Sequence, residues 1–216
     1  MHVTDARMLT ARLSGREMLE VGTEEHGTSS GLLFIVGAAG SAFGVIAPIS
    51  RTVIRITLNQ SPFWMWVDAV LWALWYSLLG FGFLGFHRRY GQESPLLVTL
   101  LALVTAVLQI LTAFVISTSV EPTPVTLPVS MYVFGVGPTI LTLAIGGYSL
   151  IEMREQSKNK ALMEGTGLAL IIGGFGTVFT VIAMITSLSG VLALWLFVEE
   201  YRVRRYIPLM RSSQCS

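Results

Sequence analysis

The stretch of sequence that decides the fold class is SPLLVTLLALVTAVLQILTAFVISTSV, residues 94–120. It contains no Asp, Glu, Lys or Arg, and its apolar residues continue without the alternation of a half-buried strand. About 17–25 mostly apolar residues allow a helix to cross the hydrocarbon of a bilayer, whereas a transmembrane β-strand shows about ten residues of alternating hydrophobicity. The stretch therefore predicts a transmembrane helix.

Four further stretches of the chain are almost as free of charge. No Asp, Glu, Lys or Arg occurs in residues 27–50, 122–151 or 165–198, and residues 56–86 contain one, Asp68. Only 12% of the chain is charged and 53% is hydrophobic, whereas a soluble domain carries about 25% charged residues. A charge at the bilayer centre costs at least about 2.5–3.5 kcal/mol. The sequence therefore predicts an all-α fold, a polytopic integral membrane helical bundle.

The first four spans can be placed directly from these apolar runs. We expect them over residues 31–49, 62–86, 95–117 and 129–151. The last run, residues 165–198, would make a helix about 51 Å long at 1.5 Å per residue. Because the hydrocarbon is only about 30 Å thick, this run predicts two elements.

The last run divides most simply at its small polar residues. Ser187, Ser189 and Gly190 predict a tight turn, which leaves a fifth span over residues 165–186 and a short sixth element over residues 191–201. The total is about six transmembrane elements. A re-entrant hairpin of the fifth and sixth elements is the alternative, because short or interrupted apolar segments can mark a transport site.

The basic residues orient these elements, because Lys and Arg concentrate on the cytoplasmic side of a membrane. With six elements and both termini cytoplasmic, all 14 Lys and Arg residues except Arg51 and Arg55 fall inside. Five spans would instead place the basic C-terminal tail outside. We therefore expect a multi-pass protein of the cell membrane with both termini in the cytoplasm.

This orientation divides the chain into three parts. Residues 31–203 form one membrane helical domain, and Glu199 and Glu200 near its end are expected at the membrane interface. Residues 1–30 form a cytoplasmic segment, for which an interfacial helix is one interpretation. Residues 204–216 form a basic cytoplasmic tail.

Three polar side chains within the predicted spans are candidates for a functional site: Asp68, Gln109 and Tyr76. An intramembrane carboxylate is expensive and is often functional, but Asp68 lies only about 9 Å along its helix from the start of the span. Two roles remain open, a structural role as an ion pair with Arg51 or Arg55 or as an interface anchor, and a transport or proton site. For Gln109 we expect a hydrogen bond between helices.

Small residues predict where helices approach one another closely. Two sets of glycines form such faces: Gly37, Gly40 and Gly44, and Gly173 and Gly176. They correspond because residues 31–50 align with residues 167–186 at ten of twenty positions, which suggests a duplicated helical hairpin. These faces would pack span one on span five, or one subunit on another. A helix kink is expected at Gly137 and Pro138, since proline removes a backbone donor.

Catalytic and cofactor motifs give no positive signal. None of the three histidines lies deep in a span, which argues against a haem site, and the one cysteine, Cys215, excludes an internal disulfide or a cysteine-rich metal site. We expect no enzyme activity, no cofactor or metal, and no nucleic-acid partner. The lipid bilayer is the expected partner of a non-catalytic subunit or interaction module, which assembles as a homo- or hetero-oligomer through its small-residue faces. The alternative is a small oligomeric transporter or ion channel that uses Asp68 and the Gly/Pro-interrupted helices.

Overall fold

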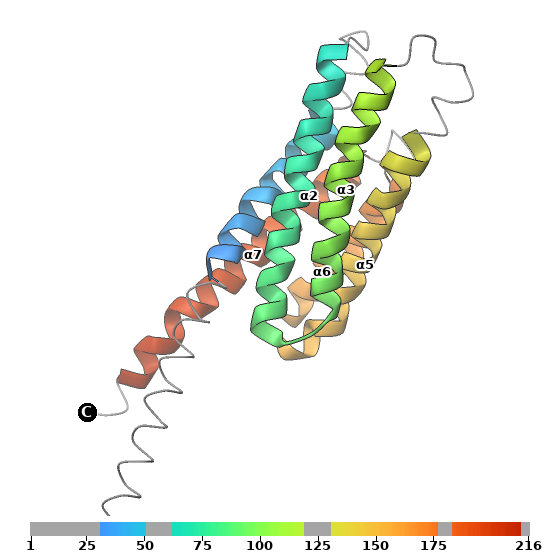
Figure 1. Ribbon diagram of the computed structural model, residues 1–216. Helices are drawn as coiled ribbons and strands as arrows, with labels where there is room; N and C mark the ends of the chain where they lie inside the picture. The colour runs from blue at the N-terminus through green and yellow to red at the C-terminus, as the bar shows by residue number, and fades with distance from the viewer. Residues whose placement is uncertain (1–30, 51–61, 119–130, 177–182, 213–216) are drawn as a thin grey trace, which may run out of the picture.

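The computed structural model describes residues 31–50, 62–118, 131–176 and 183–212, and it confirms the all-α class. The described residues form six helices and no strand (Figure 1). The helices are the first helix (Gly31–Ser50), α2 (Pro62–Tyr90), α3 (Ser94–Thr118), α5 (Gly137–Met153), α6 (Lys160–Gly176) and α7 (Ala183–Ser212). A π-helical turn, η1 (Met131–Val136), precedes α5, and a 3₁₀ turn, η2 (Arg154–Gln156), follows it.

Successive helices run in alternating directions, with α2 against α3, α5 against α6 and α6 against α7 (Figure 1). Because six helices alternate, the start of the first helix and the end of α7 lie at the same end of the bundle. The turns between α2 and α3 and between α5 and α6 are also at this end. The interfacial helix expected within residues 1–30 lies outside the described residues.

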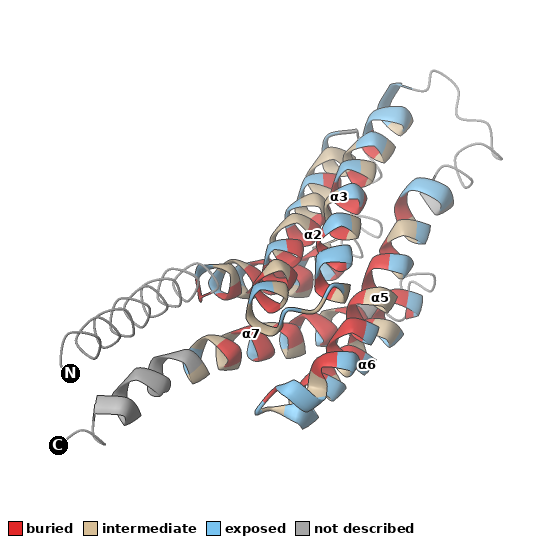
Figure 2. Cartoon of the chain, turned by 60° about the horizontal axis from the view of Figure 1, so that its bottom comes forward, coloured by how far each residue is buried: buried red, intermediate tan, exposed pale blue. Residues whose placement is uncertain are grey.

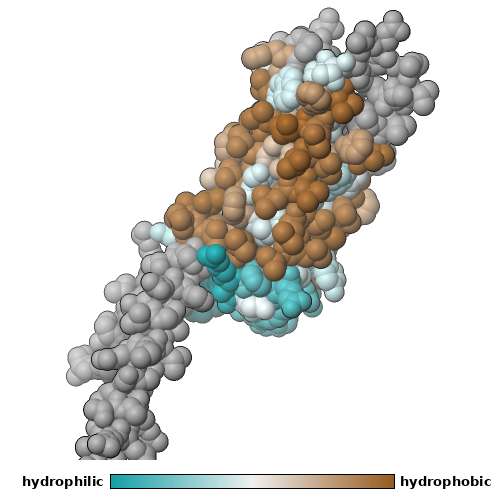
Figure 3. Space-filling view, viewed as in Figure 1, coloured by the Kyte–Doolittle hydropathy of each residue, from teal (hydrophilic) through white to brown (hydrophobic). Residues whose placement is uncertain are grey.

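Four helical segments are long and apolar enough to cross a bilayer: Gly31–Ser50, Phe63–Tyr90, Ser94–Thr118 and Val133–Gln156. Figure 3 shows an apolar wall over most of one face of the molecule, with hydrophilic residues gathered at one end. On α3, the outward side chains of Leu97, Leu100, Val104 and Val107 are at least 50% exposed. Such a wall is compatible with a membrane helical bundle, since lipid can cover apolar surface that water would not.

The turn between α2 and α3 depends on a residue that ends one helix and a residue that starts the next. Gly91 takes a left-handed φ of 68°, and its N–H donates to the carbonyl of His87 at 2.8 Å, which closes the end of α2. Pro95 lies in the first turn of α3, where a missing N–H costs nothing. The Thr99 hydroxyl then donates to the carbonyl of Gly80 at 2.9 Å and ties the two helices together.

The core includes residues of all six helices, and its aromatic part lies along the inward face of α2, between the first helix and α7. The largest buried side chains of α2 are Trp72, Trp75, Tyr76, Phe83 and Phe86. The ring of Phe86 lies 5.1 Å from that of Phe34 in the first helix and 5.5 Å from that of Phe197 in α7. Figure 2 shows the same division along the described helices, with buried residues on inward faces and exposed residues outward.

The last apolar run does not turn where the sequence predicts. α7 begins at Ala183, so Ser187, Ser189 and Gly190 lie inside this helix. The Ser187 hydroxyl donates to the carbonyl of Val45 at 3.2 Å, across the contact with the first helix. The turn prediction was wrong because small polar residues in a membrane helix can bond a backbone carbonyl and permit a close helix crossing without ending the helix. The fifth and sixth elements are therefore α6 and α7, with boundaries different from those predicted.

α7 lies beside the first helix over much of that helix's length. A Cβ atom added at Gly190 would lie 2.9 Å from the carbonyl carbon of Gly44, so the two backbones meet there. Two turns further along α7, a ring carbon of Phe197 would lie 3.0 Å from a Cβ atom added at Gly37. These contacts give an antiparallel pair in close register.

The predicted glycine faces pack inside the chain. In the first helix, Gly37, Gly40 and Gly44 lie against α2. In α6, Gly173 lies against α7, and Gly176 is buried. The described contacts therefore place the first face against α2 and α7 and Gly173 against α7, and they do not pack span one on span five through these glycines.

The internal repeat is not confirmed by the structure. Residues 31–50 form one continuous helix, whereas the matching residues 167–186 belong partly to α6 and partly to α7. The shared pattern of small and apolar residues thus serves two different arrangements, because close helix contacts of any kind favour small residues.

Gly167→Ala tests the close contact between α6 and α5. A Cβ atom at Gly167 would lie 2.6 Å from the carbonyl oxygen of Gly147, and a backbone atom cannot move aside as a side chain can. We expect the unfolding free energy to fall by about 1–3 kcal/mol, measured by thermal or SDS-induced unfolding in detergent. Gly165→Ala is the control, because a Cβ atom there meets nothing within 4 Å and alanine favours a helix. Equal effects of the two changes would contradict this packing.

Candidate functional site

Asp68 is half-buried in the second turn of α2, and its carboxylate bonds along its own helix. Its Oδ1 accepts a hydrogen bond from Trp72 Nε1 at 3.1 Å, one turn further on. The predicted partners of this carboxylate, Arg51 and Arg55, lie outside the described residues. The bond to Trp72 holds Asp68 near the aromatic start of α2, where a membrane interface is expected.

Gln109 connects α3 with the start of α5. The side chain is 4% exposed, and Nε2 donates to the carbonyl of Gly135 and to the hydroxyl of Thr139, each at 3.2 Å. The Thr139 hydroxyl in turn donates to the Gly135 carbonyl at 2.8 Å. One helical turn away, the hydroxyls of Thr105 and Thr142 lie 2.8 Å apart. Polar side chains thus bond to one another between these helices, as expected for Gln109.

The predicted kink at Gly137 and Pro138 coincides with a change of helix type. η1 is π-helical as far as Val136, and α5 begins at Gly137 with Pro138 in its first turn. Proline has no N–H to donate, and the nearby carbonyl of Gly135 accepts side-chain hydrogen bonds. Because π-helical turns often occur at functional sites, this segment of the fourth apolar run is a candidate for a role beyond helix packing.

Tyr76 lies in the aromatic core and is fully buried. Its ring stacks on that of Trp75 with centroids 4.9 Å apart, and it lies 5.9 Å from the ring of Trp72. Asp68 bonds along α2 and Gln109 bonds across to α5. Asp68 and Tyr76 therefore share Trp72 as a neighbour on α2, whereas Gln109 bonds between α3 and the start of α5.

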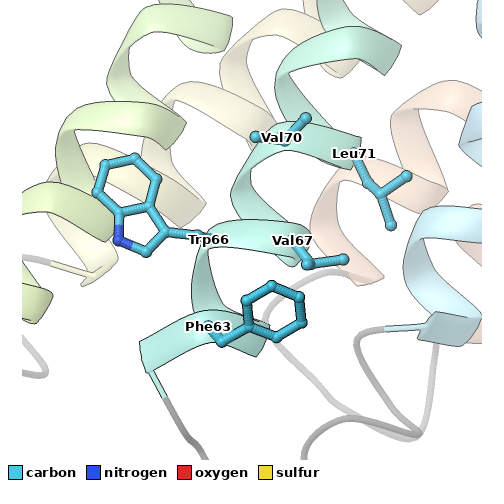
Figure 4. Close-up of a pocket in the computed structure, with 5 residues that line it drawn as sticks. All are labelled: Phe63, Trp66, Val67, Val70 and Leu71. Carbon is cyan, nitrogen blue, oxygen red and sulfur yellow. The ribbon is translucent and has the colours of Figure 1, made fainter.

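A shallow hollow of about 270 Å³ lies at the start of α2 (Figure 4). The residues that line it all come from this helix and are all apolar or aromatic: Phe63, Trp66, Val67, Val70 and Leu71. Ligand sites usually combine an enclosing apolar wall with a few polar groups that fix the ligand's orientation. This hollow is instead formed by the apolar face of one helix, and such a face is typical of a protein surface that lipid covers.

A polar cluster that was not predicted lies at the end of α2 and centres on Glu200 of α7. Glu200 is 1% exposed. Its Oε2 accepts hydrogen bonds from Arg89 at 2.8 Å and from the Tyr90 hydroxyl at 2.9 Å, and its Oε1 accepts one from the Ser157 hydroxyl at 2.8 Å. Arg89 also donates to the backbone carbonyl of Glu200 at 2.8 Å. A buried carboxylate is tolerated only with partners of this kind.

The Glu200 cluster, formed by Glu200, Arg89, Tyr90 and Ser157, fastens four segments together. Its members come from α2, from α7 and from the turn between α5 and α6. The Arg89 guanidinium also lies 5.8 Å from the ring centroid of Phe34, which adds the first helix through a cation–π contact. Because both carboxylate oxygens are bonded and the side chain is sealed from solvent, the cluster is suited to holding helices in place.

The expectation that Glu199 and Glu200 lie at the membrane interface stays a prediction, but the structure gives the two side chains different surroundings. Neighbouring residues point about 100° apart around a helix, so Glu199 pairs with exposed Arg202 at 3.1 Å while Glu200 faces α2. The sequence places Arg89 and Tyr90 at the end of one apolar run and Glu200 at the end of another. This pattern allows an ion pair between the two ends, but the sequence does not specify which two runs are neighbours.

Among the described residues, no three His, Cys, Asp or Glu side chains are grouped so that they could hold a metal ion. No protein-family model, curated protein or solved structure matches the chain.

Glu200→Gln should destabilise the protein much more than Glu199→Gln. Removing one charge of a buried ion pair costs about 3–5 kcal/mol, and we expect about 3 kcal/mol, the lower end, because the Arg89 side chain is 23% exposed. The pair of Glu199 with Arg202 is more exposed, and surface pairs contribute about 0–1 kcal/mol. Unfolding of both variants in detergent measures the difference. Similar losses would show that the Glu200 cluster does not hold the helices.

Proposed function

We propose that the protein is a non-catalytic helical membrane protein that acts as a subunit or interaction module of a membrane assembly. The observation that supports this proposal is the closed interior of the described bundle. Aromatic rings fill the space between the first helix, α2 and α7, and the buried side chains of Gln109 and Glu200 bond to neighbouring helices. Transport instead requires polar groups that line a route for the substrate.

Assembly with a second copy or with another chain is part of this proposal. Since Gly37, Gly40, Gly44 and Gly173 pack inside the chain, the partner would use other surfaces. The apolar outward face of α3 is one such surface, because helices associate in lipid through van der Waals packing of apolar side chains.

A small transporter or ion channel is the second candidate. It is favoured by the π-helical turn η1, where the Gly135 carbonyl and the Gln109 amide lie together inside the bundle. Half-buried Asp68 would contribute the charge, as intramembrane carboxylates do in proton and ion pathways. This candidate requires the polar groups to bind a passing ion, in addition to bonding one another.

An ion-flux assay with purified protein in liposomes separates the two candidates. For wild type, Asp68→Asn and Gln109→Leu, we expect fluxes of Na⁺, K⁺ and H⁺ equal to those of protein-free liposomes, because aromatic rings and bonded polar side chains fill the interior of the described bundle. A wild-type flux that either substitution reduces would overturn the proposal and support transport. The unfolding temperature of each variant serves as a control that any change in flux does not come from misfolding.

We further propose that both termini are cytoplasmic. The support is the gathering of positive charge at the end of the bundle where the first helix starts and α7 ends. The last turn of α2 contains His87, Arg88 and Arg89, and the turn after α5 contains Lys158 and Lys160. Lys and Arg in short loops favour the cytoplasmic side.

Cysteine labelling tests this orientation. In a Cys215→Ser background, Ser117→Cys and Gln156→Cys place one thiol at each end of the bundle, at positions that are exposed in the structure. We expect a membrane-impermeant maleimide to label Ser117→Cys in intact cells, and to label Gln156→Cys only after the membrane is permeabilised. The reverse pattern would invert the topology, and labelling of both from outside would contradict the spanning of α3 and α5.

A further inference from the structure

Charge is unevenly distributed at the end of the bundle where α7 ends. In the turn between α5 and α6, Arg154 pairs with Glu155 at 3.5 Å and with Glu164 at 3.4 Å. Lys160 also pairs with Glu155. Acidic and basic side chains therefore largely compensate one another in this turn.

The last turns of α7 differ from this turn in their sequence. The helix continues from Glu200 to Ser212, about 18 Å at 1.5 Å per residue. Beyond Glu200 the chain has four arginines and no Asp or Glu: Arg202, Arg204, Arg205 and Arg211. The two preceding acids are already engaged, Glu199 with Arg202 and Glu200 with Arg89. The last turns of α7 therefore form a basic helical extension, residues 201–212.

The basic extension begins where the apolar part of the bundle ends. Glu200 is fastened to Arg89 and Tyr90 at the last turn of α2, which marks this level along the bundle. α7 runs obliquely to α2, α3 and α5 and continues past them on one side (Figure 1). In a membrane, a helix that leaves the apolar region at this point passes through the layer of lipid headgroups.

We propose that the basic extension of α7 binds the anionic headgroups of the membrane that holds the protein. Clusters of Lys and Arg that directly follow a transmembrane helix are attracted to anionic lipid surfaces. From Arg202 to Arg211 the arginines span about 14 Å of helix, which is wider than one phosphate and matches a surface of several headgroups. The Glu200 cluster holds the preceding turn of α7 in place, so the extension starts at a defined depth. This inference rests on the membrane placement in the proposed function.

The native Cys215 allows a direct test, because it is the one cysteine of the chain and follows the basic extension. The full-length protein is labelled there with an environment-sensitive fluorophore and placed, one copy per disc, in nanodiscs of phosphatidylcholine with or without phosphatidylglycerol. We expect a blue shift, and quenching by spin-labelled lipid, only with phosphatidylglycerol. Both signals should disappear at 1 M salt, where the Debye length falls to about 3 Å.

Two triple variants decide whether α7 carries the effect. Each arginine near an anionic surface favours binding about fivefold, so changing Arg204, Arg205 and Arg211 to Gln should lower the ratio of bound to free label about 100-fold. The control changes Arg154, Lys158 and Lys160 to Gln, which removes the same charge from the turn between α5 and α6. This control should keep the response of the wild type.

Several results would overturn the inference. Equal emission in the two kinds of nanodisc, or an equal loss in both triple variants, would show that the extension does not recognise anionic lipid. A response in phosphatidylcholine alone that grows with the number of copies per disc would identify a second copy as the partner instead. A chain that does not enter nanodiscs would overturn the proposed function as well, whereas an inserted chain with an unresponsive label overturns this inference alone.

Discussion

Polar groups buried among apolar side chains must find hydrogen-bond partners inside the protein, and the same holds where lipid covers a helix. The helices satisfy this requirement for the backbone, and side chains follow the same rule. Gln109 bonds across to the start of α5, Ser187 bonds a carbonyl of the first helix, and Glu200 collects donors from Arg89, Tyr90 and Ser157. These three polar residues therefore join helices, and their bonds link distant parts of the chain.

Close approach of backbones is the second condition for these bonds. Gly37 meets Gly82, Gly147 meets Gly167, and Gly190 meets the backbone at Gly44, so that neighbouring helices touch without side chains between them. Large rings then fill the remaining space along α2. Small residues thus allow the backbones to approach, and aromatic rings fill the space that remains. A methyl group at one of the close contacts would move the helices apart and so lengthen the hydrogen bonds between their polar groups.

Much of the architecture could be predicted because the hydropathy of a stretch depends only on the residues within it. The charge-free run of residues 94–120 predicts a helix, and α3 occupies Ser94–Thr118. The same reasoning failed at Ser187, Ser189 and Gly190, since these residues suit a turn and a helix crossing equally well. It also gave no sign that Glu200 is buried against α2, because a charge at the end of an apolar run can face either solvent or a neighbouring helix. Such cases depend on a neighbour that lies far away in the sequence.

The sequence by itself determined the all-α class, the placing of the first four apolar helices, and the confinement of nearly all charge to their ends, because each depends only on the composition of contiguous residues. The tertiary structure decided which helices touch. Arg89 and Glu200 are 111 positions apart, and Ser187 and Val45 are 142 apart, so only the packing of α7 against α2 and the first helix brings them together. That packing places Glu200 and Ser187 in contacts between helices, where they help to hold the bundle together.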